Sequence, residues 1–154
     1  MPHFNDLSPI LLKKIAGYCG IQALMQFKKT SVKMNETFGQ DSIKQSLIVD
    51  LEQDGTLLQK LPDFQDNCDI VLVAVSQNGC ALKYASVTLQ NDRKIVLAAV
   101  SKHGCALRYA SLNLQNDPDI VLVAVSQNGC ALKYASLNLQ NDPDIILVAV
   151  SQNG

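Results

Sequence analysis

The spacing of apolar and polar positions divides the chain into two regions. After residue 65 a 25-residue unit recurs, and it places glycines at positions 79, 104, 129 and 154. Three full copies cover residues 66–90, 91–115 and 116–140, and a partial fourth copy runs from residue 141 to residue 154. A fixed period of this kind is typical of tandem-repeat proteins, in which each repeat packs mainly on its neighbours.

Each copy contains two apolar blocks, which we interpret as two helices. In the third copy the first helix is expected over residues 118–128, with Asp117 as the N-cap and Pro118 at the first helical position. The pair Asn128-Gly129 is typical of a helix C-terminus. The second helix is expected to be shorter, over about residues 130–136.

The apolar run at residues 120–125 leaves a second interpretation open. The sequence Ile-Val-Leu-Val-Ala-Val is rich in β-branched residues and could form a buried parallel strand in a strand–helix horseshoe. Helix is favoured by the Asp-Pro starts and by the pair Ala98-Ala99 in the second copy, and the leucine-rich repeat signature is not found in the repeats. A helix that is apolar almost all round must lie between neighbouring elements.

The region before the repeats shows a different helical pattern. Ser8 is a suitable N-cap, and Leu7 can pack on Leu12 across the start of that helix. Further apolar residues mark one face of this helix and two more short helices: Leu11, Ile15, Tyr18, Leu24, Phe27, Met34 and Phe38. We therefore expect three parts: a three-helix module over residues 4–38, a helical linker over 39–65 and the repeats over 66–154.

The segment that starts Leu7-Ser-Pro-Ile-Leu-Leu-Lys-Lys-Ile and continues to residue 35 resembles an F-box motif. It departs from the family pattern at Ser8, where the family has proline, and at Ile10, where it has glutamate. The resemblance implies docking on the Skp-type linker protein of an SCF ubiquitin ligase and, through it, on a cullin. The residues that would make this contact are Leu7, Pro9, Ile10, Leu11, Ile15, Tyr18, Leu24, Phe27 and Met34.

The repeats resemble the domain of unknown function 4116 family. The resemblance is carried by the pattern Asn-Asp-x-x-Ile-Val-Leu-x-Ala-Val-Ser-x-x-Gly-x-Ala-Leu-x-Tyr-Ala-Ser. It implies an all-helical fold and a bacterial effector that works in a host cytoplasm. The expected fold class is thus all-α, with an F-box-like module followed by a short α-solenoid of two-helix repeats.

Composition and charge argue against several classes of function. The chain is 47% hydrophobic and 18% charged, which is typical of a folded protein, and its net charge of −1 argues against a nucleic-acid or membrane surface. The longest apolar runs have six residues, whereas a membrane-spanning helix needs about 20. Five cysteines, an odd number, indicate reduced thiols and a cytoplasmic location.

Two columns of residues recur once per repeat. Tyrosines follow a basic residue in each copy, giving the pairs Lys83 and Tyr84, Arg108 and Tyr109, and Lys133 and Tyr134. These pairs could pack within the repeats, recognise a target protein, or stack on single-stranded RNA. The cysteine column is expected to be small buried packing residues rather than a metal site, because packed helices lie about 8–10 Å apart: Cys80, Cys105 and Cys130.

No arrangement of a nucleophile with a base is recognisable in the sequence, so we expect no enzyme activity and no cofactor. His103 stands where other copies have asparagine, and we expect it at a solvated helix end. The helix over residues 145–150 lacks its partner, so we expect a longer parent protein or an exposed edge. The predicted function is an F-box-type adaptor that captures a target through its repeats, and the alternative is a repeat scaffold with no link to ubiquitin.

Overall fold

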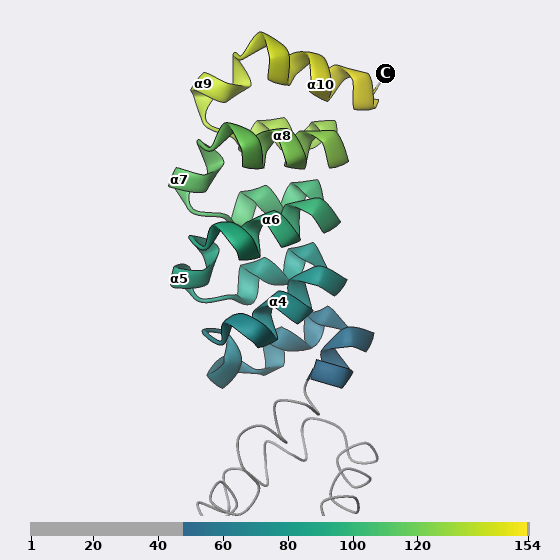
Figure 1. Ribbon diagram of the computed structural model, residues 1–154, viewed down its shortest axis with the longest axis vertical. Helices are drawn as coiled ribbons and strands as arrows, with labels where there is room; N and C mark the ends of the chain where they lie inside the picture. The colour runs from purple at the N-terminus through teal and green to yellow at the C-terminus, as the bar shows by residue number, and fades with distance from the viewer. Residues whose placement is uncertain (1–47, 154) are drawn as a thin grey trace, which may run out of the picture. The chain divides into compact units, whose positions relative to one another are not determined.

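A computed structural model describes residues 48–153 of the chain. Every regular element in this range is helical, so the helical interpretation of the repeats is confirmed and the strand alternative is wrong. Residues 50–154 group together as one unit by their contacts. The long helices of successive repeats stack in chain order, and the shortest helices line one side of the stack (Figure 1).

Each full repeat contains three helical segments where two were predicted. A ten-residue α-helix is followed by a six-residue 3-10 helix and a four-residue α-helix. Ahead of the repeats, residues 48–53 are helical and are followed by η2 (Gly55–Lys60) and η3 (Pro62–Phe64). The repeat elements are α4 (Cys68–Gln77), η4 (Gly79–Tyr84), α5 (Val87–Gln90), α6 (Arg93–Lys102), η5 (Gly104–Tyr109), α7 (Leu112–Gln115), α8 (Pro118–Gln127), η6 (Gly129–Tyr134), α9 (Leu137–Gln140) and α10 (Pro143–Asn153).

The predicted second helix corresponds to the 3-10 helix, and an additional short helix follows it because a serine starts a new helix there. In the second repeat, Ala110 has an extended backbone, with φ −72° and ψ 157°. Ser111 then caps α7, and its hydroxyl accepts a hydrogen bond from the Leu114 amide at 3.4 Å. Serine favours this capping geometry over the helix interior, since its hydroxyl competes for backbone partners. The serine thus ends the 3-10 helix and begins α7.

The start of the long helix follows the prediction. The Asp117 carboxylate accepts hydrogen bonds from the amides of Asp119 and Ile120, at 3.1 and 3.2 Å, and Pro118 occupies the first turn. The helix end differs from the prediction, because Asn128 is extended, with φ −156° and ψ 109°. Its side chain accepts from the Cys130 amide at 2.9 Å and so caps the following 3-10 helix. The Asn-Gly pair therefore begins η6 and does not form a left-handed helix end.

The core is made by the long helices, and α4, α6 and α8 each bury two adjacent stripes of side chains. In α8 the fully buried side chains are Ile120, Val121, Ala124 and Val125, which lie at positions i, i+1, i+4 and i+5. This helix contacts α6 on one side and α10 on the other. Val150 occupies the same place in α10 as Val125 in α8, yet it is 62% exposed. Burial of the second stripe therefore depends on the presence of a following repeat.

Val125→Ala should destabilise the protein, and Val150→Ala should not. Val125 is fully buried, so its loss should cost about 2 kcal/mol, from about 0.8 kcal/mol per methylene plus the cavity left behind. The exposed Val150 makes the same chemical change a matched control, with an expected effect below about 0.5 kcal/mol. Urea unfolding followed by circular dichroism measures both. Equal effects would contradict the difference in burial.

The repeat glycine lies against the backbone of the next repeat. A Cβ on Gly79 would overlap the carbonyl oxygen of Ala99, and a Cβ on Gly104 would overlap that of Ala124. Neither glycine has a left-handed backbone. Glycine is required here because the 3-10 helix closely approaches the following long helix, and any side chain would prevent this approach.

Gly104→Ala should therefore separate two neighbouring repeats. The added methyl group meets backbone atoms, which cannot rotate away, so we expect a loss of about 1–3 kcal/mol in the free energy of unfolding. Asn113→Ala, at an exposed position in the same repeat, serves as the control and should stay within about 0.5 kcal/mol. An unchanged urea midpoint for Gly104→Ala would show that the contact is not needed.

Residues 50–65 pack as a shortened copy of the repeat. A Cβ on Gly55 would overlap the carbonyl oxygen of Ala74, which repeats the contact of Gly79 with Ala99. Leu58 is fully buried, as is Leu82 at the same place in η4. The linker expected over residues 39–65 thus overlaps the repeat unit from Asp50 onward.

One serine per repeat bonds both within its own copy and to the preceding one. The Ser86, Ser111 and Ser136 hydroxyls donate to Asp66, Asn91 and Asn116 of the same copy, at 2.6, 2.5 and 2.6 Å. The backbone amides of the same serines donate to glutamine carbonyl oxygens of the preceding repeat at 2.8–3.0 Å. Successive repeats are therefore joined here by backbone bonds, and the hydroxyls of Ser86 and Ser111 also cap the helices that follow them.

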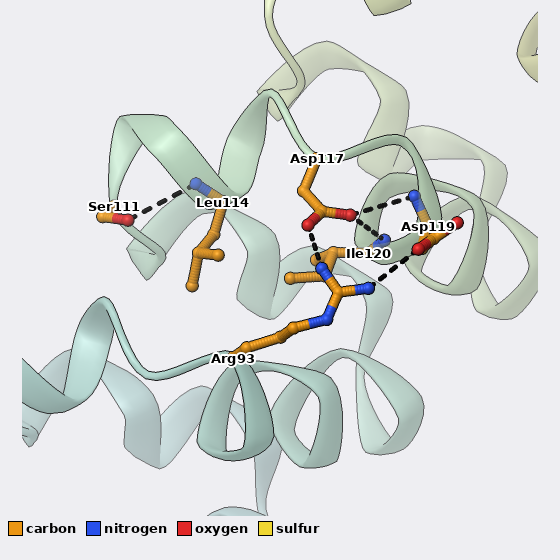
Figure 2. Close-up of polar contacts among 6 residues, drawn as sticks. All are labelled: Arg93, Ser111, Leu114, Asp117, Asp119 and Ile120. Carbon is orange, nitrogen blue, oxygen red and sulfur yellow. Dashed lines mark hydrogen bonds and ion pairs between the residues drawn. The ribbon is translucent and has the colours of Figure 1, made fainter.

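A further link joins the second and third repeats. The Arg93 guanidinium binds the carboxylates of Asp117 and Asp119, and the second of these contacts measures 2.8 Å (Figure 2). The Asp117 carboxylate thus binds Arg93 through one oxygen and caps α8 through the other. The Arg93 side chain is 46% exposed, so the pair is partly screened by water.

Candidate partner-binding column

Six side chains form what we call the cation–tyrosine column: Lys83, Tyr84, Arg108, Tyr109, Lys133 and Tyr134. Each pair ends a 3-10 helix, and η4, η5 and η6 contact one another in order. Because the 25-residue period is kept, equivalent residues lie in line along the stack. The structure therefore brings together all the residues for which target binding was considered in the repeats.

The cations of the column lie over tyrosine rings. The Lys83 and Lys133 ammonium groups are 4.5 and 4.9 Å from the ring centres of Tyr84 and Tyr134. Arg108 lies over two rings, 4.9 Å from the centre of Tyr109 and 5.8 Å from that of Tyr134. These distances are within the range of cation–π attraction, so the rings hold the cations in fixed positions. Arg108 also connects two neighbouring repeats.

The tyrosines are half-buried, and the cations beside them are exposed. The Tyr84 hydroxyl donates a hydrogen bond of 2.8 Å to the Gln59 carboxamide of the preceding η2. Part of each ring therefore packs within the stack, as the packing interpretation expected, and part remains accessible. Such a surface combines aromatic area with fixed charge, a pairing that is common where proteins recognise other proteins.

The charge of Lys83 is maintained over the whole physiological pH range. A side-chain hydrogen bond with Tyr84, together with Coulombic attraction to it, raises the pKa of Lys83 above its ordinary value of 10.5. A raised pKa stabilises the protein below pH 10.5, and this contribution is lost only as the pH rises through the folded-state value. At neutral pH the column therefore presents a full positive charge here.

The 3-10 helices η2, η4, η5 and η6 and the short α-helices of the repeats carry charge of one sign only. The elements η2, η4, η5 and η6 and the short helices α5, α7 and α9 contain four basic residues and no aspartate or glutamate: Lys60, Lys83, Arg108 and Lys133. Carboxylates stand instead at the starts of the long helices, as at Asp69, Asp119 and Asp144. The cation–tyrosine column is thus a local positive surface in a chain with almost no net charge.

An exposed row of apolar residues, not predicted from the sequence, begins the short helices. Val87, Leu112 and Leu137 are 80%, 82% and 74% exposed, and each is the first residue of a four-residue helix. We call these three residues the apolar stripe. The sequence did contain a signal for this row, since each of the three residues directly follows the serine at the N-cap of its helix. A helix of four residues is too short to bury its first side chain.

The cysteine column is less buried than predicted. Cys80 and Cys105 are half-buried, and Cys130 is exposed. Among the described residues, no three His, Cys, Asp or Glu side chains come together to hold a metal. The prediction of buried packing residues was therefore wrong, because the buried positions of each 3-10 helix are those on either side of the cysteine, as at Gly104 and Ala106.

His103 takes part in a contact between repeats. Its ring nitrogen Nδ1 accepts a hydrogen bond of 3.1 Å from the Gly79 amide. In the next repeat the Gln127 side chain plays the same part, accepting from the Gly104 amide at 2.5 Å. His103 is exposed, as expected, but it also satisfies the backbone of the preceding repeat.

The other predicted contact residues lie outside the described part of the chain. These are the F-box-like positions: Leu7, Pro9, Ile10, Leu11, Ile15, Tyr18, Leu24, Phe27 and Met34.

Comparison with known families supports the repeat pattern. Residues 50–90, 92–140 and 117–154 each match the family described as Domain of unknown function (DUF4116). The chain belongs to the DUF4116 family. The first DUF4116 match begins at residue 50, where the structure also begins the repeat unit. Searches of curated proteins and of solved structures return no match. In residues 48–153 no helix is both long and apolar enough to cross a lipid bilayer.

Proposed function

We propose that the repeats form a short α-solenoid whose function is to bind another protein along the cation–tyrosine column. The observation that carries this proposal is the alignment of three exposed cations with three half-exposed tyrosines, one pair per repeat. Repeat arrays commonly bind partners along such extended surfaces, because each repeat contributes the same kind of contact. The chain would supply binding, and its partner would supply any chemistry.

RNA binding is a weaker alternative for the same residues. Stacking on tyrosine would suit single-stranded RNA, but affinity for RNA depends on a strong positive field around the site. The repeats over residues 66–154 carry six basic and seven acidic residues. This balance favours a protein partner, which can be recognised by local charge and shape.

A selection with random peptides tests the scaffold proposal. The full chain is immobilised, and peptides displayed on phage are enriched on it. We expect the enriched peptides to bind in solution and to lose about tenfold or more in affinity for Tyr109→Ala with Tyr134→Ala, because aromatic anchors dominate such interfaces.

The control for this selection is the pair Val123→Ala with Val148→Ala. These two valines are also 25 residues apart, but they belong to the long helices α8 and α10 and not to the column. Peptides that bind all three proteins equally would show that the column is not the binding surface.

We further propose that residues 4–38 attach this scaffold to a ubiquitin ligase. Support comes from the F-box-like sequence, in which Leu11 and Ile15 share one helical face. A module of about 35 residues is too small to bury all its apolar side chains by itself, so a partner would cover the remainder. The chain would then act as an adaptor that brings a bound protein close to the ligase, and as an effector it would do so inside a host cell.

Calorimetry with the purified Skp-type linker protein tests the adaptor role. The full chain should release or absorb heat on mixing, and Leu11→Asp with Ile15→Asp should abolish the signal, because charge would be buried at the interface. Lys13→Asp, on another face of the same helix, should bind like the unchanged chain. Absence of heat at tens of micromolar for the unchanged chain would leave the scaffold without a ubiquitin link.

A further inference from the structure

We infer that the partner segment is an extended acidic peptide that runs along the stack and places one carboxylate on each repeat. This inference rests on the proposed binding function and adds the chemistry and conformation of the ligand. It depends on charge, spacing and the position of the apolar stripe.

Charge complementarity gives the first part of the inference. Lys83, Arg108 and Lys133 are exposed, and each is held over a ring by a cation–π contact. The 3-10 helices and short helices of these repeats contain no carboxylate that could neutralise them. Positioned cations without a local anion are suited to charge-assisted hydrogen bonds with a carboxylate ligand.

Spacing gives the conformation of the ligand. Packed helices lie about 8–10 Å apart, so the backbone positions that carry the cations recur at about that spacing from one repeat to the next. A polyproline II chain rises about 3.1 Å per residue and repeats every three residues, or about 9.3 Å. An acidic residue at every third position would therefore meet one cation per repeat. A helical ligand rises only about 1.5 Å per residue and would not present its acidic residues with this simple three-residue spacing.

The remaining faces of such a peptide also have partners on this surface. Val87 follows Tyr84 by three residues, so their Cα atoms are at most about 11 Å apart. The half-exposed tyrosines and the apolar stripe thus border the cations in every repeat. Extended proline-rich segments commonly dock on aromatic surfaces in this manner. The expected ligand therefore combines acidic residues with apolar residues or prolines between them.

A synthetic peptide of three Glu-Leu-Pro triplets, labelled with fluorescein, tests this inference. Fluorescence anisotropy with the full chain should give a Kd of about 10–100 µM. The same peptide with glutamine in place of glutamate should bind about tenfold more weakly, because the charge-assisted contacts are lost. A peptide of the same composition with its three glutamates in a row should also bind more weakly, because only one cation would be reached.

Two matched variants of the protein locate the contact. Lys83→Glu with Lys133→Glu should weaken binding of the acidic peptide about tenfold or more. Lys94→Glu with Lys102→Glu makes the same change in net charge on α6, away from the column, and should alter the affinity less than twofold. Circular dichroism and a thermal melt verify that both variants stay folded.

Several results would overturn the inference. The acidic peptide could fail to bind at about 1 mM, or the glutamine and rearranged peptides could bind as tightly as it does. The two charge variants could lose affinity equally, or a single-stranded oligonucleotide could bind more tightly than any peptide. If the acidic peptide fails but peptides from the phage selection still require Tyr109 and Tyr134, the scaffold survives and only the acidic ligand class is wrong.

Discussion

The close contact between a glycine and the backbone of the next repeat sets the geometry of this protein. Where Gly79 meets the Ala99 carbonyl oxygen, no atom of a side chain separates the 3-10 helix from the following long helix. The same contact recurs at Gly55 and Gly104, so successive repeats approach each other in one repeated manner. Residues at equivalent positions consequently fall into straight columns. Both the buried stripes of the long helices and the cation–tyrosine column depend on this alignment.

Much of the fold could be predicted because the same local sequence signals, such as helix caps, recur in several repeats. The N-cap and proline at Asp117 and Pro118 predicted the start of α8, since these residues act locally through the first helical turn. The role of Gly104 could not be found in this way. Glycine permits either a left-handed backbone or a close approach, and only the position of the next helix distinguishes the two. The short helix that begins after Ser111 also went unpredicted, because the amide bond of this serine to the preceding repeat is not visible in sequence.

The candidate site shows a similar division between what was predictable and what was not. The pairs of cation and tyrosine were evident from the period alone, and their alignment follows from the stacking. The degree of exposure was not predictable, because it depends on how far each side chain lies from the neighbouring repeat. Tyr84 is half-buried, while Leu112, a more apolar residue, is largely exposed at the start of a short helix. Residue type alone would have suggested the reverse.

The serine bonds between repeats have a consequence for how such a gene can change in length. Each of these bonds runs from a serine amide to a carbonyl oxygen 21 residues earlier, as in Ser111 and Gln90, so donor and acceptor belong to successive copies. Recombination that inserts or removes a whole unit recreates every donor beside a matching acceptor, whereas a gain of any other length misaligns them. Viable length variants should therefore differ by multiples of a single unit.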